Sequence, residues 1–199
     1  MNQIKERPIL FSAPMVRAIL DGRKTVTRRP VKGAGLKWLE DFTPEYVADP
    51  ANSLCPYGKP GDRLWVRETC FINDYRQAGV PVEERADVDL VYRADPLPDW
   101  EGEESLITWR PSIHMPRWAS RILLEITDVR VERLQDISRA DIRAEGLQCP
   151  PELGGDDVSP NYRDWYPAAW RQLWESINGA DSWNANPWVW VVEFKRVTP

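Results

Sequence analysis

The stretch Gly22-Arg23-Lys24-Thr25-Val26-Thr27-Arg28-Arg29 decides how the rest of the chain is interpreted. It predicts that a helix ends at Gly22 and that a strand begins at Thr25, because glycine terminates helices and β-branched residues favour an extended backbone. Four cationic side chains lie within seven residues of this junction. A junction that carries a hydroxyl, an amine and guanidiniums is suited to chemistry on a polar or anionic substrate. A solvated basic turn that leads into an edge strand would explain the same residues.

Length and charge set the outer limits of the interpretation. The chain has 199 residues, of which 42% are apolar and eleven are Trp, so it can bury a substantial core as one large or two small domains. The formal net charge is −5, with a local +6 in residues 1–40 and −11 in the remainder. This balance excludes a broad basic footprint for coating nucleic acid, but it permits a local basic pocket.

The cysteine and histidine content indicates a reducing compartment and no metal. Cys55, Cys70 and Cys149 are odd in number and form no Cys-x-x-Cys pair, which favours free thiols over a disulfide framework. With His114 as the single histidine, we expect no zinc site and no other cofactor. We find no apolar segment typical of a signal peptide or of a membrane helix. We therefore expect a soluble, cytoplasmic protein without a membrane partner.

The first half of the chain alternates strands and loops. We expect a strand at 8–12, a helix from 13 to Gly22 and a long loop at 30–60. Residues 63–71 predict a strand with Leu64, Val66, Glu68 and Cys70 on one face. Glu68 is unusual on an apolar face, so it is either paired or functional.

The middle of the chain contains an acidic segment followed by an aromatic segment. Residues 72–105 are acidic and turn-rich, and we interpret them as an insertion. Residues 107–118 alternate aromatic side chains and arginines, and could line a pocket for a flat ring. Trp118 fits a place in this pocket and a place in the core equally well. Arg117 precedes it in the sequence.

The second half contains the clearest patterns. The alternation of apolar residues from 122 shifts phase near Thr127-Asp128, which predicts a β-bulge. A short helix at 139–144 is expected to be capped by Ser138 and stopped by Gly146, with Glu145 at its end. A loop at 147–161, a helix from about Pro167 and a final strand at 188–197 follow. We interpret Trp170 and Trp174 on that helix as core residues.

Together these elements predict a mostly β protein of the α+β class. The expected architecture is a small β-barrel with two to three flanking helices, forming one domain over residues 1–199. The expected insertions lie at about 30–60, 72–105 and 147–161.

Four blocks of the sequence resemble the ASCH domain, a PUA-like β-barrel. They are the Gly-Arg-Lys-Thr-Val-Thr-Arg stretch at 22–28, Gly-Asp-Arg-Leu at 61–64, the segment 134–147, and Trp-Val-Trp-Val-Val-Glu-Phe at 188–194. The blocks occur in the family's order and span nearly the whole chain. The Trp-rich ending resembles the longer ASCH proteins encoded by phages and prophages.

The resemblance implies a role directed at RNA or nucleosides. One bacterial branch of the family hydrolyses the acetyl amide of N4-acetylcytidine with a lysine, a threonine and a glutamate, which correspond here to Lys24, Thr27 and Glu145. That branch is about half as long and lacks the insertions. Further residues expected to contact substrate or RNA are Arg23, Thr25, Arg28, Arg29, Glu68, Arg117 and Trp118.

Amide hydrolysis requires a nucleophile, a base and an acid for the leaving nitrogen. In this assignment Thr27 attacks, Lys24 in its neutral form is the base, and Glu145 protonates the leaving group. Residues three apart on a regular strand face opposite sides, so Lys24 and Thr27 meet only if Lys24 still lies in the turn or the strand is bulged. Otherwise Thr25, which shares a face with Thr27, is the alternative nucleophile.

Three other functions remain open from the sequence. A non-catalytic RNA-binding module would use Lys24, Arg28, Arg29, Arg117 and Trp118. A metal-free ribonuclease would need Lys24 and a carboxylate, because a single histidine excludes the usual pair of imidazoles. A phage accessory protein could bind a host protein through its Trp-rich surface. The expected partner is therefore a modified nucleoside or RNA.

Overall fold

The computed structural model describes residues 4–74, 78–87, 90–96, 107–151 and 165–197. Its α-helices and strands, in chain order, are β1 Glu6–Leu10, α1 Ala13–Leu20, β2 Val26–Pro30, α2 Ala34–Asp41, α3 Pro44–Ala48, β3 Arg63–Arg67, β4 Cys70–Ile72, β5 Leu90–Tyr92, β6 Leu123–Arg133, α5 Arg139–Ala144, α6 Trp165–Asn178 and β7 Trp188–Val197. Short 3₁₀ turns lie at Val82–Asp87, Ser112–His114, Arg117–Ala119 and Leu134–Asp136.

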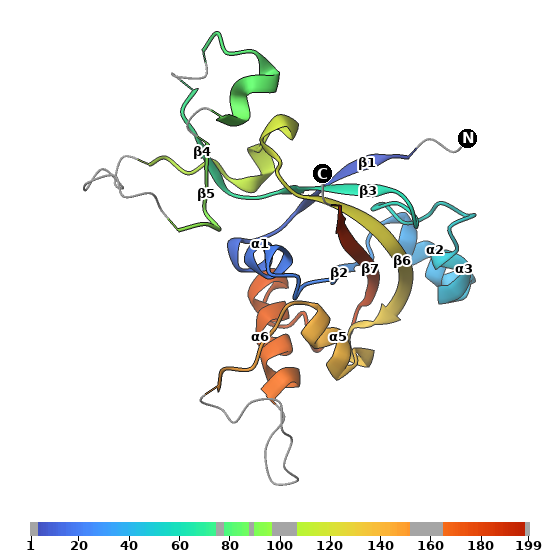
Figure 1. Cartoon of the computed structure of the whole chain (residues 1–199). Helices are drawn as coiled ribbons and strands as arrows, with labels where there is room; N and C mark the ends of the chain where they lie inside the picture. Colours follow the sequence, from blue (N-terminus) through green and yellow to red (C-terminus); the bar gives the residue numbers. More distant parts are fainter. Residues whose placement is uncertain (1–3, 75–77, 88–89, 97–106, 152–164, 198–199) are drawn as a thin grey trace.

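The five long strands form one sheet in the order β1-β3-β6-β7-β2, and β4 and β5 form a separate ribbon. β1 pairs with β3 in parallel, and the other neighbours are antiparallel. β6 and β7 curve strongly, as Figure 1 shows, so the sheet wraps around its core. Within the described chain no ladder joins β1 to β2, so the sheet stays open at these edges. The predicted α+β class is confirmed, and the expected barrel is a curved but unclosed sheet.

The predicted bulge lies in β6. The β6–β7 register shifts between Ile126 and Asp128, while Thr127 is left without a partner in that ladder. Ile126 before the bulge and Val129 after it are both buried. The extra residue therefore keeps both halves of a long strand facing the core while the strand bends.

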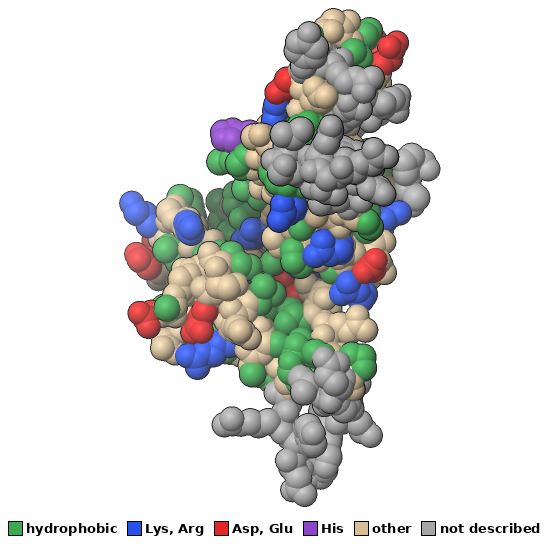
Figure 2. Space-filling model, turned by 90° about the vertical axis from the view of Figure 1, so that its left-hand side faces the viewer, with side chains coloured by type: hydrophobic (Ala, Val, Ile, Leu, Met, Phe, Trp, Pro, Cys, Tyr) green, Lys and Arg blue, Asp and Glu red, His purple; other side chains and the backbone are tan. Residues whose placement is uncertain are grey.

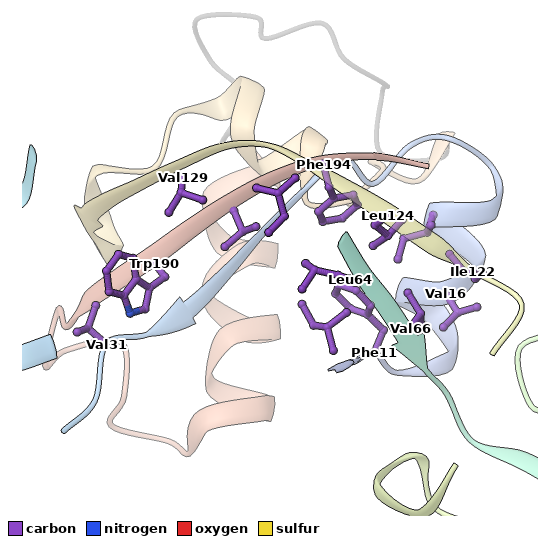
Figure 3. Close-up of a cluster of buried hydrophobic side chains, with 14 of the residues drawn as sticks. Phe11, Val16, Val31, Leu64, Val66, Ile122, Leu124, Val129, Trp190 and Phe194 are labelled. Carbon is purple, nitrogen blue, oxygen red and sulfur yellow. The ribbon is translucent and has the colours of Figure 1, made fainter. Parts of the chain in front are cut away.

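The larger core lies on the concave side of the sheet. Figure 3 shows Leu64, Val66 and Phe11 at one end of this core and Trp190 with Val31 at the other. A second core fills the space between the sheet and the helices α5 and α6. Its buried residues include Val26, Leu134, Ile142, Tyr166, Trp170, Trp174, Val189 and Val191.

Several predicted element boundaries differ from the structure. The first strand begins at Glu6 and not at residue 8, and the stretch 63–71 is divided into β3 and β4. The expected loop at 30–60 is wrong in part, because it contains α2 and α3. The described residues hold five α-helices, where two to three flanking helices were expected. The predicted loop at 147–161 falls mostly outside the described residues.

The described ranges contain no helix that is both long enough and apolar enough to cross a bilayer.

Leu64 tests the position of the larger core. Its side chain is fully buried in β3, whereas Leu10 at the end of the neighbouring β1 is 41% exposed. Leu64→Ala is expected to lower the free energy of unfolding by about 2–5 kcal/mol, because it leaves a cavity in the core. Leu10→Ala is the matched control and is expected to stay within about 0.5 kcal/mol. Urea denaturation measures both, and equal losses would contradict the placement of the core.

Candidate functional site

A glycine turn positions Lys24 before the strand begins. Gly22 adopts a φ of +73°, and the N–H groups of Arg23 and Lys24 both donate to the carbonyl of Ala18 at 2.8 and 2.9 Å. Lys24 forms an isolated antiparallel bridge with Glu145, and β2 starts only at Val26. Lys24 therefore lies between the glycine turn and β2, outside the regular strand.

A second glycine permits this bridge. Gly146 has a φ of +95°, and a Cβ there would lie 2.8 Å from the Cβ of Ala18 and 3.1 Å from that of Lys24. A larger residue would push the end of α5 away from the end of α1. Ser138 caps the other end of α5 by accepting from the Asp141 N–H at 3.0 Å, as predicted. The two glycines and this cap fix the position of Glu145.

The Lys24 side chain is fully buried and its ammonium group is fully bonded. Nζ donates to Glu145 Oε2 at 2.6 Å, to the Glu145 carbonyl at 3.0 Å and to the Val26 carbonyl at 2.8 Å. Three acceptors match the three protons of an ammonium group. Burial lowers the pKa of Lys24, and Arg28 and Arg29 lower it further, while Glu145 opposes the shift. The lysine thus reaches its neutral form more readily than a solvated one.

Glu145 connects Lys24 to a wider charge network. Its carboxylate is 2% exposed, and its second oxygen accepts from Arg28 Nη1 at 3.4 Å. The buried Arg28 guanidinium also donates to Asp141 at 2.8 Å and to Glu132 at 3.2 Å. Alternating charges of this kind hold each other in place when they are shielded from water.

A small cavity of about 50 Å³ opens against this network. It is lined by Met15, Thr27, Arg28, Arg29, Pro30, Glu145, Trp170, Trp174, Ile177 and Asn178. A water molecule in liquid water occupies about 30 Å³, so the cavity has room for one or two waters or a small acyl group. Thr27 and Glu145 both line this space, whereas Lys24 does not line it and is bonded to Glu145.

Several donors at the cavity have no partner. Within the described residues, the indole N–H groups of Trp170 and Trp174 and the Nε–H groups of Arg28 and Arg29 are buried without a hydrogen-bond acceptor. A buried donor without an acceptor costs about 1–3 kcal/mol. Such groups are usually completed in folded proteins by ordered water or by a bound molecule.

Arg29 forms the wall of the cavity next to β1. Its Nη2 donates to the Leu10 carbonyl at 2.6 Å, and its guanidinium lies 5.3 Å from the centre of the Phe11 ring. Burial is the main cause that lowers the pKa of Arg29. Lys24 Nζ lies 5.5 Å from the same ring. One aromatic side chain thus contacts two of the predicted cationic residues.

Two further predicted residues lie at the edge of the site. Arg23 donates to the Gly146 carbonyl at 2.8 Å and pairs with Asp21 at 2.7 Å, so it supports the glycine turn from outside. Thr25 is exposed and does not line the cavity. Of the two threonines, Thr27 is the one that lines the same cavity as Glu145.

Three predicted residues lie elsewhere. Glu68 is 1% exposed and accepts from Arg121 through both carboxylate oxygens, at 2.9 and 3.1 Å. Its place on an apolar face is therefore explained by this ion pair. Arg117 pairs with Glu6 at 2.9 Å. Trp118 packs against the small core around Cys70. These residues do not line the cavity beside Thr27.

Sequence reasoning missed part of the site. Trp170 and Trp174 are core residues as predicted, but they also line the cavity, and nothing in their spacing signals an unpaired indole N–H. Asp141 was also missed, although its position four residues before Glu145 places both carboxylates on one helix face. Across the described ranges, no group of three or more His, Cys, Asp or Glu side chains is arranged to hold a metal ion.

Comparison with known proteins gives matches at the level of structure. No family model matches the chain, and a search of curated proteins finds no match. An ASCH domain from Lactobacillus crispatus JV V101 is similar over 96% of this chain and 79% of its own, with 14% identity and a TM-score of 0.42. Protein EF3133 from Enterococcus faecalis V583, of the family DUF984, is similar over 99% and 82%, with 10% identity and a TM-score of 0.41.

The Lys24–Glu145 contact predicts strong energetic coupling. Lys24→Met is expected to destabilise the protein by about 3–5 kcal/mol, because it leaves a buried carboxylate with fewer partners. Glu145→Gln removes the opposite charge, so the double variant is expected to cost less than the sum of the single variants, by about 0.5–3 kcal/mol. Chemical denaturation of the four proteins measures this coupling.

The exposed pair Arg171–Glu175 on α6 is the control for this cycle, at 3.1 Å. Its Arg171→Met and Glu175→Gln variants are expected to couple by less than about 0.5 kcal/mol, since solvent screens the pair. A Lys24–Glu145 coupling no larger than this would mean that the buried contact is absent in solution.

Proposed function

We propose that the protein hydrolyses the amide bond of an N-acylated pyrimidine base or nucleoside, of the N4-acetylcytidine type, through Lys24, Thr27 and Glu145. The observation that carries the proposal is the buried 2.6 Å contact between Lys24 and Glu145, beside a small cavity lined by Thr27. The same three positions are the ones that the sequence resemblance implies. Amine, hydroxyl and carboxyl groups are together sufficient for acyl transfer without a metal.

The buried pair can supply both the base and the acid. Burial disfavours both charges, so transfer of the shared proton from Lys24 to Glu145 costs less here than in water. The transfer produces an amine and a carboxylic acid. Lys24 Nζ donates to the carbonyl of Val26, the residue before Thr27, which supports a position near the attacking hydroxyl.

The reaction then proceeds in two balanced steps. The Thr27 oxygen bonds to the acyl carbon and the bond from that carbon to the pyrimidine nitrogen breaks. The hydroxyl proton passes to the Lys24 amine, and the Glu145 carboxyl proton goes to the leaving nitrogen. Water then attacks the acyl-threonine, Glu145 takes a proton from the water, and Lys24 returns one to Thr27. The product is a free carboxylic acid, and the pair regains its initial protons.

The size of the cavity supports one orientation of the proposed substrate. A volume of about 50 Å³ is far below the roughly 300–1,000 Å³ of pockets that enclose a drug-sized ligand. The acyl group would therefore enter the cavity and the pyrimidine would remain at its mouth. The unpaired donors of Trp170, Trp174 and Arg28 would then face the acyl oxygen, whose negative charge grows in the transition state.

RNA binding without catalysis is the second candidate. It is favoured by Trp65 on β3, which has the guanidiniums of Arg67 and Arg117 at 5.4 and 5.6 Å from its ring. Aromatic rings flanked by arginines stack well on unpaired bases. Blue and red side chains lie next to one another over the face seen in Figure 2, so its cations are interspersed with carboxylates. That mixture favours a local site over an extended phosphate-binding surface.

Substitution of the nucleophile tests the proposed reaction. Thr27→Ala and Glu145→Gln are each expected to reduce acetate release from N4-acetylcytidine by about 100-fold or more, since each removes a group that handles a proton or bond in the transition state. Thr27→Ser keeps the hydroxyl and is expected to remain active. Thr127→Ala, at an exposed threonine on β6, is the matched control and should behave as the parent. Release of acetate is measured directly in the full-length variants.

Two outcomes would reject this assignment. Undiminished acetate release from Thr27→Ala would exclude Thr27 as the nucleophile, and loss in Thr25→Ala would transfer the role to Thr25. A parent protein that releases no acetate, but binds short RNA with an affinity that falls steeply with salt, would be a binding module.

The pH dependence tests the role of Lys24. In the proposed steps the active pair holds one proton, which Lys24 gives to Glu145, so kcat/KM is expected to fall when rising pH removes this proton. Because burial lowers the pKa of Lys24, this fall should be centred below the ordinary value of 10.5. Glu145→Gln has no shared proton, so its residual activity should instead rise with pH as Lys24 becomes neutral, and at a still lower pH because the charge that raises the Lys24 pKa is gone. A profile that is flat over the same range would exclude Lys24 as the base.

A further inference from the structure

A second and larger cavity lies between the start of β1 and the loop that precedes β3. Its volume is about 250 Å³, and its lining includes Lys5, Arg7, Gly58, Lys59 and Asp62. None of these residues lines the Thr27 cavity.

The charge around this cavity is positive. Three cations and one carboxylate line it, which gives a formal charge of +2. Among the described residues, neither the Lys5 nor the Lys59 ammonium group forms a hydrogen bond or an ion pair. Both cations are therefore available to a ligand.

Asp62 acts as an anchor for the pocket. It is 5% exposed and accepts from the backbone N–H groups of Lys5 at 3.1 Å and Lys59 at 3.3 Å, and from Arg7 Nη1 at 3.0 Å. Burial alone would raise the pKa of Asp62, but these donors hold it below its usual range. An ionised Asp62 thus fixes one edge of the Arg7 guanidinium and holds the two lysine backbones on either side of it.

Gly58 shows that the backbone is shaped around this pair. Its φ is +122°, and a Cβ there would lie 2.8 Å from Arg7 Nη1 and 2.9 Å from Asp62 Oδ2. Any other residue would displace the guanidinium from the carboxylate. Cys55 also lines the cavity, and burial raises the pKa of its thiol, so it adds no negative charge at neutral pH.

We infer that this cavity is a binding pocket for a phosphate group, held by Lys5, Arg7 and Lys59. A planar guanidinium oriented by a carboxylate presents a fork that matches phosphate oxygens, and lysines supply mobile point charges. The formal charge of +2 balances a phosphate monoester dianion. The phosphate belongs either to a free nucleotide or to an RNA strand. The inference does not depend on the proposed hydrolysis.

A titration with matched ligands tests the pocket. The probes are cytidine, cytidine 5′-monophosphate, and a short RNA with either a 5′-phosphate or a 5′-hydroxyl group. Isothermal titration with the full chain is expected to show that a phosphate-bearing probe binds, and that Lys5→Met/Lys59→Met weakens it at least tenfold. Lys37→Met, at an exposed lysine on α2 outside the cavity, is the matched control and should bind as the parent.

The probes distinguish the two sources of phosphate. If cytidine 5′-monophosphate binds as tightly as the 5′-phosphorylated RNA, the ligand is a terminal or free phosphate monoester. If both RNAs bind equally and the nucleotide does not, the ligand is a backbone phosphate. The inference is overturned if no phosphate-bearing probe binds, or if the Lys5/Lys59 variant binds as the parent does. It is equally overturned if Lys37→Met weakens binding as much, because the attraction is then unspecific. These are binding measurements, so their result is independent of acetate release.

Discussion

The contact between the Lys24 ammonium group and Glu145 is the constraint on which the arrangement of the site depends. It joins the end of α1 to the end of α5 across 121 residues of sequence. Removing both charges from water is costly, and the cost is recovered only when every donor and acceptor is bonded. Here the ammonium group has three acceptors, and the carboxylate has a second cation in Arg28. Gly146 is needed because its Cα approaches Ala18 and Lys24 too closely for a Cβ, and Gly22 is needed because the turn that leads to Lys24 has a positive φ.

Stability alone is a weak reason for a protein to contain such a pair. Well-packed apolar residues of similar volume are often as stabilising as a buried ion pair, or more so. The second core that surrounds Val26, Ile142 and Val191 shows that the chain fills neighbouring space with apolar side chains. The charges instead stand next to a cavity whose tryptophan and arginine donors lack acceptors. A buried ion pair next to donors without acceptors is typical of a site that binds or converts a ligand. A core that served only stability would avoid this combination.

The elements that the sequence predicts correctly are those with a local physical signal. The phase shift after Ile126 marks the bulge, and Ser138 and Gly146 mark the two ends of α5. Helix α2 was missed because the Pro and Gly residues of 30–60 indicate a loop, although the apolar residues of α2 do gather on one face of the helix. The contacts of the site are mostly non-local. Glu68 is odd in the sequence, but its partner Arg121 lies 53 residues away, and no spacing rule predicts that pairing. The sequence resemblance did indicate Lys24, Thr27 and Glu145, whereas the closure of the cavity by Trp170 and Trp174 depends on how α6 packs.

Glu68 and Glu145, two of the three buried carboxylates among the described residues, differ in what their partners can do. Glu68 accepts from Arg121, whose guanidinium lies 3.7 Å from the centre of the Tyr92 ring and also binds Asp95. Arginine keeps its proton at any ordinary pH, and these carboxylates raise the pKa of Arg121 further despite its partial burial. That pair is static, because no proton can leave it toward a substrate. Lys24 is different, because burial brings an ammonium group nearer to the point where it becomes an amine. Of these two pairs, only the one that contains a lysine can exchange a proton between its members, and it is also the one that borders a cavity lined by Thr27.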